Sequence, residues 1–212
     1  MTPAGRAPAA HLVPVPAELL AADSVAVAPR LLNCLLAHGD RVVRIVEVEA
    51  YRGEEDPASH AYRGRTSRNG SMFGPPGRLY VYFTYGMHWC ANVVCGKEGE
   101  ARAVLLRAGA PVAGLAAIRA ARPAARTDAD LCSGPAKLCQ ALGIDRAQDG
   151  VDLLDGHAPV RLLSDGVPPP DRPGVGPRVG IRSATEMPWR WWVPGDPNVS
   201  AHRSRRGSSD SQ

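Results

Sequence analysis

Alternation of polar and apolar positions is clearest at residues 44–51, a run that predicts a β-strand. Because successive side chains of a strand point to opposite faces, Glu47, Glu49 and Tyr51 share one face and the apolar side chains share the other. A carboxylate at the end of a hydrophobic strand is suited to activate water, since burial raises its basicity and the strand fixes its direction. The alternative is that the two glutamates form surface cross-strand pairs with no chemical role.

A second patterned stretch, residues 79–94, predicts two strands around a tight tip near Tyr85 and Gly86, where glycine accepts the positive φ that such a turn needs. Tyr85 and Met87 would point outward from this tip. Large apolar side chains at an exposed tip suggest insertion into a partner. The intervening residues 52–77 are too long for a tight turn, and loops of that length usually carry function. Polar side chains in this loop are His60, Arg63, Arg65, Arg68 and Asn69.

The remaining pattern predicts further short strands and helices. Strands are expected at residues 34–37, 41–51, 103–107, 178–181 and 188–193. Helices are expected within 16–32 with Ser24 as N-cap, at 112–121, and at 135–142 between a Ser133 N-cap and Gly143, whereas 166–177 reads as a surface loop. Strands joined mostly by hairpins favour a largely antiparallel sheet with helices packed around it. We therefore predict a mixed α/β (α+β) fold in a single domain with a protruding β-hairpin.

Composition narrows the class of protein. A chain of 212 residues with 44% hydrophobic residues is expected to form one compact domain, residues 16–200, between a flexible leader at 1–15 and a disordered basic tail at 201–212. The net charge of +4 comes almost entirely from arginine, which suits a phosphate-rich partner, although a solvated basic surface is an equally simple explanation. Five cysteines without a CxxC pair fit reduced thiols rather than a disulfide framework or a zinc site. No apolar run is long enough to span a membrane.

Five segments together resemble a known family. VEVEAYRGEEDPASHAYRGRTSRNGSMFGPPGRLYVYFTYGMHWCANVV, AVLLRA, LCSGPAKLCQALGI, GPRVGI and VPGDPNVS are similar, in the same order, to motifs of the 3-methyladenine (alkyladenine) DNA glycosylase family. The resemblance covers residues 16–200, nearly the whole chain. It implies a curved antiparallel sheet and the hydrolytic removal of damaged purines from double-stranded DNA.

The resemblance also implies roles for individual residues. Glu49 matches the base that activates water, and Arg107 and the backbone carbonyl of Val179 match the groups that hold this water. Tyr51, His60 and Tyr82 match the residues that enclose the base after it is flipped out of the duplex.

Further matches concern selectivity and DNA contacts. Asn92 matches a side chain that collides with the 2-amino group of guanine, and Tyr85, with Met87 beside it, matches a residue that enters the minor groove and fills the space left by the flipped base. Candidate contacts to DNA phosphates are Arg65, Arg68 and Lys137, the last lying one turn into a helix whose first amides can hold an anion. An ordinary capped helix would account for Lys137 equally well.

The sequence thus predicts a monofunctional DNA glycosylase that uses water as nucleophile, needs no metal or cofactor, acts as a monomer, and is cytoplasmic or associated with the nucleoid. One alternative is a non-catalytic module that stacks nucleic-acid bases on the hairpin tyrosines. Another is a carbohydrate glycosidase that uses Glu47 and Glu49 as a pair. That pair must flank the cleaved bond from opposite sides, whereas these two side chains point the same way. The preferred lesion among 3-methyladenine, 7-methylguanine, hypoxanthine and ethenoadenine stays open.

Overall fold

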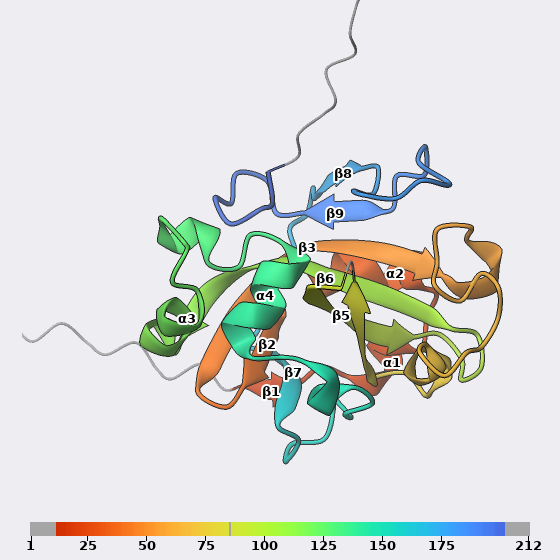
Figure 1. Cartoon of the computed structure of the whole chain (residues 1–212), viewed down its shortest axis with the longest axis horizontal. Coiled ribbons are helices and arrows are strands. Elements are labelled where there is room, and N and C mark those ends of the chain that lie inside the picture. Colours follow the sequence, from red (N-terminus) through yellow and green to blue (C-terminus); the bar gives the residue numbers. More distant parts are fainter. Residues whose placement is uncertain (1–11, 85, 202–212) are drawn as a thin grey trace, which may run out of the picture.

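The computed structural model describes residues 12–84 and 86–201, so the expectations for Tyr85, for the tail after residue 201 and for the leader before residue 12 lie outside the described residues. Within them, nine strands form one antiparallel sheet in the order β1-β7-β2-β3-β6-β5-β4, with β9 paired to β3 and β8 paired to β9 (Figure 1). The strands are β1 Val13–Pro14, β2 Leu35–His38, β3 Arg41–Arg52, β4 Leu79–Thr84, β5 His88–Cys95, β6 Arg102–Ala113, β7 Val160–Ser164, β8 Gly174–Gly176 and β9 Arg190–Trp192. The mixed α/β fold with its curved, antiparallel sheet is confirmed.

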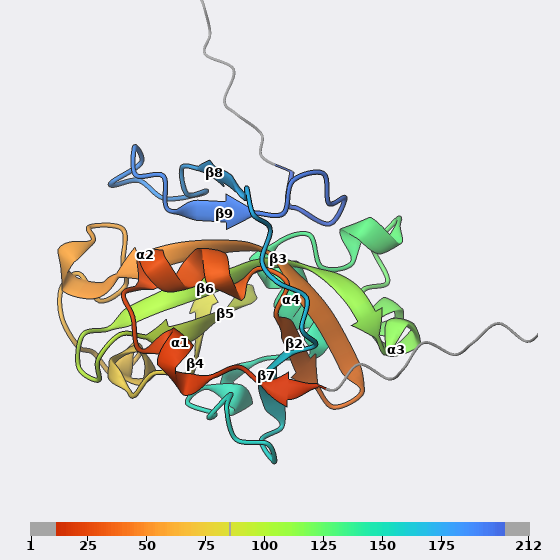
Figure 2. The same cartoon turned by 180° about the vertical axis from the view of Figure 1, so that it is seen from behind.

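Short helices cover both faces of the sheet. The α-helices are α1 Ala17–Leu20, α2 Ser24–Val27, α3 Leu115–Ala121 and α4 Pro135–Leu142, and the 3-10 helices are η1 Ala28–Leu31, η2 Gly53–Glu55, η3 Gly70–Phe73, η4 Asp128–Asp130 and η5 Arg146–Gln148. In Figure 1, α4 lies in front of the sheet against β5 and β6, whereas Figure 2 brings α1 and α2 to the front. The core therefore lies on both sides of the central strands.

Strand β3 is the centre of this arrangement. It pairs with β2 at its start, with β9 at Glu47 to Glu49, and with β6 along its whole length. The apolar face is buried as expected, but the polar face is buried too, since Glu47 and Glu49 have no exposed surface. The alternative that these glutamates form surface pairs is therefore wrong. The pairing of β3 with β6 is irregular on either side of Glu47.

The hairpin of β4 and β5 extends past the edge of the sheet. Thr84 pairs with His88 near its tip, whereas β5 begins to pair with β6 only at Asn92. Gly86 has a φ of +66°, the left-handed conformation that the sequence predicted for this turn. Met87 is 69% exposed, which confirms that the tip presents an apolar side chain outward.

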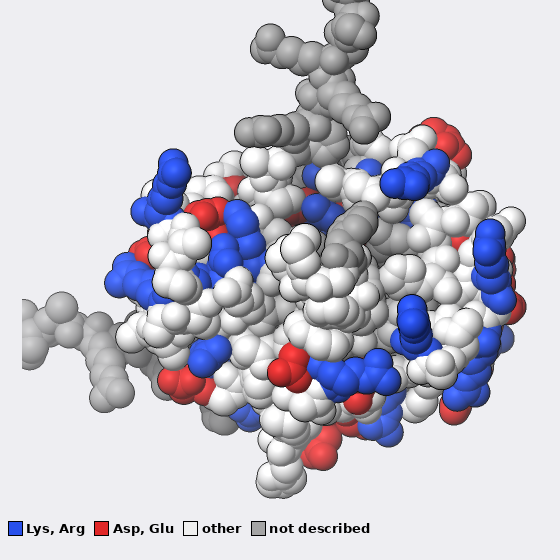
Figure 3. Space-filling view, in the orientation of Figure 1, with Lys and Arg blue, Asp and Glu red and all other residues white. Residues whose placement is uncertain are grey.

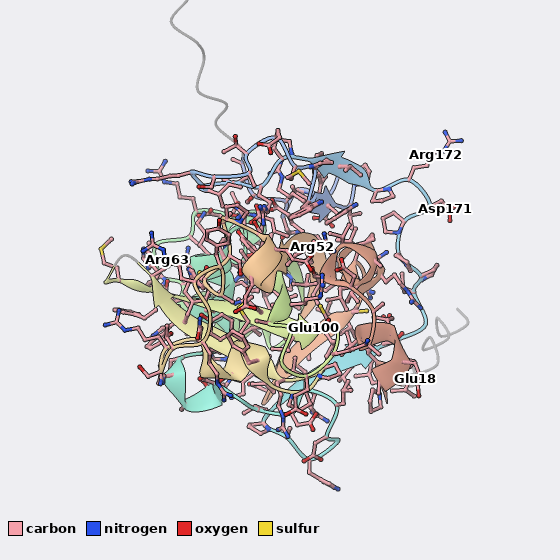
Figure 4. All side chains as sticks on the ribbon, turned by 90° about the vertical axis from the view of Figure 1, so that its right-hand side faces the viewer. Glu18, Arg52, Arg63, Glu100, Asp171 and Arg172 are labelled. Carbon is pink, nitrogen blue, oxygen red and sulfur yellow. The ribbon has the colours of Figure 1, made fainter. Side chains whose placement is uncertain are left out.

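Ion pairs at the surface connect several elements at one end of the sheet. Arg52, at the end of β3, contacts Asp23 and Glu55 at 3.1 and 3.0 Å, and Arg102 on β6 contacts Glu100 at 3.0 Å. Arg52 and Glu100 face the viewer in Figure 4, which shows this side of the molecule. Asp23 also bonds to Arg102, so the network joins the start of α2 to both central strands.

Two predicted helix starts are wrong by a few residues. Asp23, not Ser24, caps α2, and its Oδ1 accepts a 2.9 Å hydrogen bond from the amide of Val25. Helix α3 begins at Leu115 rather than at residue 112, because β6 continues to Ala113. The chain then turns at Gly114, where φ is +70° and a Cβ atom would lie 2.5 Å from the carbonyl oxygen of Asp40.

Helix α4 has the predicted bounds, with Gly143 in the left-handed conformation at its end. Its N-cap, however, is Gly134 rather than Ser133, whose hydroxyl donates to Asp130 Oδ1 at 3.2 Å instead. The strand predicted at residues 178–181 is also wrong, since these residues form an irregular loop after β8. The predicted strand at 188–193 is confirmed in shortened form as β9.

All five cysteines are buried and none forms a disulfide. Burial raises the pKa of the Cys34 thiol to about 11 and that of Cys132 to about 12. Trp191 is part of the main core, and Trp189 packs against it. Among the described residues, no helix has the length and apolar character to cross a membrane.

Candidate active site

A cavity of about 660 Å³ opens beside the hairpin, within the size range of small-ligand sites. It lies between β4–β5, the loop after η2, the start of α4 and the loop after β8. Its lining includes Tyr51, Pro57, Ala58, His60, Met72, Tyr80, Tyr82, Thr84, His88, Cys90, Asn92, Leu105, Arg107, Pro135, Ala136 and residues 179–183. In Figure 3, a largely uncharged ridge crosses the centre of this face, with lysine and arginine side chains around it.

Glu49 lies directly beneath the cavity lining, and the hydrogen-bonding and ionic partners of its carboxylate, Tyr51, Val179 and Arg107, belong to that lining. Its Oε1 accepts a 2.7 Å hydrogen bond from the backbone amide of Val179 and lies 3.2 Å from Nη1 of Arg107. Burial raises the pKa of Glu49, and the charge of Arg107 opposes this rise only in part. The arrangement places a carboxylate of raised basicity just behind the cavity lining.

The structure refines the expectation for Val179. The resemblance assigns a role to its carbonyl, whereas the hydrogen bond to Glu49 comes from its amide. Arg107 and Val179 do meet at the predicted base, so the three residues lie together as expected.

Glu47 has a different environment. It accepts hydrogen bonds from Nε of Arg107 at 3.1 Å, from Nη1 of Arg190 at 3.2 Å and from the amide of Ser200 at 2.8 Å. It does not line the cavity. Burial alone would lower the pKa of Arg107, but Glu49 and Glu47 raise it overall, so the guanidinium stays charged between the two carboxylates. Glu47 therefore fixes Arg107 and joins β3, β6 and β9.

Aromatic rings form one wall of the cavity. The rings of His60 and Tyr82 meet edge to face with centroids 4.2 Å apart, and Tyr80 stacks on Tyr82 at 5.6 Å. His60 Nδ1 lies 3.2 Å from the hydroxyl of Tyr80. Burial lowers the pKa of His60, so its imidazole is neutral near pH 7. The predicted group of Tyr51, His60 and Tyr82 is thus brought together around one space.

Asn92 also lines the cavity and is held firmly. Its Nδ2 donates a 3.1 Å hydrogen bond to the carbonyl oxygen of Tyr80, and only 4% of the residue is exposed. This bond fixes which way the amide faces. Asn92 therefore presents an amide of fixed orientation to the cavity.

The three residues predicted to contact DNA phosphates have different surroundings. Arg65 and Arg68 are exposed on the loop between η2 and η3. Arg68 also borders a second hollow of about 690 Å³ next to the first, with Arg146 on its rim. Lys137 forms an ion pair with Asp130 and lies 3.2 Å from the hydroxyl of Ser133. The cavity is lined at α4 by Pro135 and Ala136 rather than by Lys137.

The sequence analysis missed several lining residues. Thr84, His88 and Cys90 belong to the same alternation as Tyr82 and Asn92, so the period of two along the hairpin was a sufficient signal for them. Arg182 and Ser183 also line the cavity, but they lie in an irregular loop whose sequence gives no periodic signal.

A family model described as Methylpurine-DNA glycosylase (MPG) matches residues 18–197. The chain therefore belongs to the methylpurine-DNA glycosylase family.

Curated relatives agree along most of the chain. A protein of Burkholderia lata is 56% identical over 205 residues, which covers 96% of this chain and 98% of the relative. A protein of Streptomyces avermitilis is 50% identical over 197 residues, which covers 90% of this chain and 92% of the relative. Both carry the provisional name 3-methyladenine DNA glycosylase.

Proposed function

We propose that this protein removes alkylated or deaminated purines from double-stranded DNA by hydrolysing the N-glycosidic bond with water activated by Glu49. The observation that supports this most strongly is the position of Glu49: fully buried, with Tyr51, Arg107 and Val179, all of which line the cavity, as its hydrogen-bonding or ionic partners. A target base within a duplex must leave the stack to reach such a site. The proposal is therefore one of base flipping followed by hydrolysis.

In the proposed reaction, the flipped purine stacks against the aromatic wall that contains His60 and Tyr82. Base stacking of this kind contributes about 1–3 kcal/mol per base and tolerates different bases. The bond between C1′ of the sugar and the purine nitrogen breaks, and its electron pair stays with the purine. Water adds to C1′ and gives its proton to Glu49, while Arg107 keeps the carboxylate in place. Lesions that already carry a positive charge leave without further protonation.

Residues around the cavity support a DNA substrate. Met87 extends from the hairpin tip and is proposed to enter the minor groove together with Tyr85. Arg65, Arg68 and, at the mouth of the cavity, Arg182 are exposed and suited to phosphate oxygens. We include Arg182 because its loop also carries Val179. Lys137 is a weaker contact, since Asp130 already neutralises its charge.

The environment of Glu47 argues against the alternative of a carbohydrate glycosidase, which needs this residue as its second catalytic carboxylate. Glu47 accepts hydrogen bonds from Arg107, Arg190 and Ser200, two of which lie outside the cavity lining, so its carboxylate is engaged away from the cavity and is poorly suited to act there as an acid or base. The alternative of a non-catalytic binding module predicts that lesion duplexes bind without base release, and the same assay tests this outcome.

The test is single-turnover base release from duplexes that each carry 3-methyladenine, 7-methylguanine, hypoxanthine or ethenoadenine. We expect release of at least one lesion by the wild type. Glu49→Gln should reduce the rate by about 10²–10⁴-fold while retaining lesion binding, because the amide cannot accept the proton. Glu54→Gln, at an exposed position in η2, is the matched control and should leave the rate unchanged. Near-normal release by Glu49→Gln would refute the assignment of the base.

A further inference from the structure

One wall of the cavity is an irregular segment that few contacts hold in place. Within the described part of the chain, hydrogen bonds from residues 177–183 to other segments come only from Arg178 and Val179. Arg178 Nη1 donates to the carbonyl oxygen of Ala50 at 3.0 Å, and its Nη2 donates to Oδ1 of Asp56 at 2.9 Å. The position of Val179 beside Glu49 therefore depends on the residue just before it.

Asp56 shapes a second wall of the same cavity. Its Oδ1 accepts a 3.0 Å hydrogen bond from the amide of Ala58, and its backbone carbonyl accepts one of 2.8 Å from Ser59. These bonds define the turn that brings Pro57, Ala58 and His60 to the cavity. A single carboxylate thus organises this turn and binds the guanidinium of the opposite loop.

The guanidinium of Arg178 also supports the wall of the cavity that contains Tyr51. Its central carbon lies 4.6 Å from the ring centroid of Tyr51 and 5.0 Å from that of Trp189. Tyr51 in turn donates to Glu49 Oε2 at 3.0 Å. The side chains of Arg178 and Asp56 have no exposed surface and neither residue lines the cavity. The pair lies behind the walls rather than in the site.

We infer that the ion pair of Arg178 with Asp56 is a positioning unit for the proposed reaction, which keeps the amide of Val179 and the phenol of Tyr51 on the carboxylate of Glu49. This inference rests on the proposed function. Neither residue touches the substrate or the reacting atoms. Replacement should therefore affect the rate of the chemical step more than the binding of DNA.

The expected mechanism follows from the groups that face Glu49. Arg107 on β6, the amide of Val179 and the phenol of Tyr51 favour the charged carboxylate, whereas Glu47 on β3 disfavours it. Cys90 on β5 also faces this carboxylate, which raises the pKa of its thiol, although burial is the larger cause. If the amide and the phenol move away, the pKa of Glu49 rises further. The base is then protonated over a wider pH range.

The test compares Arg178→Lys with a matched control. Lysine keeps the charge opposite Asp56 but loses the planar fork and the stacking on Tyr51. We expect single-turnover excision to fall by about 10–100-fold, with unchanged lesion affinity and the acid limb of the pH–rate profile moved to higher pH. The control is Arg44→Lys on the same strand as Glu49, because Arg44 also makes a two-pronged pair, with Asp165 at 2.6 and 3.2 Å, but does not line the cavity. It should retain the rate and the pH profile.

The inference would be overturned if both variants lost excision rate equally, in proportion to their loss of thermal stability, and if the acid limb of the pH–rate profile did not move. Carbon-13 NMR titration of the Glu49 carboxyl gives a second readout without DNA, and Arg178→Lys should raise that pKa relative to wild type. A wild type that releases no lesion would refute the proposed function, whereas an unchanged titration would refute the positioning role. Should Arg178→Lys fail to fold, Asp56→Glu preserves both charges and carries the same expectations.

Discussion

The phenol of Tyr51 donates a 3.0 Å hydrogen bond to Oε2 of Glu49, two residues earlier on the same strand. Side chains at i and i+2 share one face of a strand, so β3 itself places the donor beside the acceptor. Burial, and then the charge of Glu49, hold the pKa of Tyr51 well above its usual range, so the phenol remains a donor. Because Tyr51 also lines the cavity, the proposed base and a wall of the proposed substrate site are parts of one strand.

Tyr51→Phe tests this relationship by removing only the hydroxyl group. The hydrogen bond from Tyr51 lowers the pKa of Glu49, so its loss should raise that pKa further above its usual value. The proposed reaction requires the deprotonated base. As the pH is lowered, the excision rate of the variant should therefore begin to fall at a higher pH than that of the wild type. We expect about a 10- to 100-fold loss at pH 8, since a hydrogen bond to a charged group contributes about 1.5–3 kcal/mol. Single-turnover rates across pH measure this effect, and coincident profiles would contradict it.

Glu49→Gln should also change stability. The pKa of Glu49 is raised in the folded protein by burial, so the folded state holds this proton more tightly than the unfolded state. The stability that this group contributes is complete below its ordinary value of 4.5 and is lost as the pH rises through the raised value. Glutamine does not ionise, so the melting temperature of the variant minus that of the wild type should be higher at pH 8 than near pH 4.5. Calorimetry should show the difference shrinking toward pH 4.5.

Asn92→Ser tests selectivity. The amide of Asn92 is held by its bond to Tyr80, so a base that projects a group toward it meets a fixed obstacle. Serine removes most of that volume, and release of normal guanine relative to hypoxanthine should rise by about tenfold or more, the range expected for removal of a steric contact in a pocket. Measuring both bases in the same duplex context controls for general loss of activity. A constant ratio would show that Asn92 does not face the base.

Met87→Ala tests the hairpin tip. The side chain is 69% exposed, so its removal should cost the free protein little stability. Unstacking a base costs a few kcal/mol, which an inserted side chain offsets in part. The variant should lose more activity on a lesion in a well-paired duplex than on the same lesion opposite a mismatch. Equal losses on the two substrates would indicate a surface tip without a role in base flipping.

If water is the nucleophile, no covalent intermediate between the protein and DNA should form. Cleavage through a Schiff base needs an amine beside the sugar. The two lysines of the chain are Lys97, in the turn between β5 and β6, and Lys137, which is paired with Asp130; neither lines the cavity. Borohydride treatment during the reaction should trap no adduct, and strands should stay intact without alkali. A trapped adduct at stoichiometric yield would refute hydrolysis.

The alternation of side chains between the two faces of a strand explains most of what could be predicted from the sequence. It identified β3, the hairpin, and the common face of Glu49 and Tyr51, because both patterns are local properties of a strand. It did not reveal that Glu47 differs from Glu49. That difference arises from the irregular pairing of β3 with β6 around Glu47 and from partners far along the chain, Arg190 and Ser200.

Errors occurred where neighbouring residues compete for one role. Asp23 and Ser24 are both good N-caps, and only the packing of α2 decides between them. Residues 178–181 have strand-like composition, but Arg178 turns inward to Asp56 and the amide of Val179 bonds to Glu49 rather than to a strand. Such tertiary partners leave no periodic trace in the sequence.

The buried cysteines have a consequence for a protein that works on alkylation damage. Methylating agents attack thiolates, and the rate falls with the thiolate fraction and with access to the sulfur. With a pKa of about 11, Cys34 is ionised to only about one part in 10⁴ at pH 7. The other four thiols are buried with raised pKa values as well, including Cys90 at the cavity. These thiols are therefore expected to react slowly with the reagents that create the protein's proposed substrates.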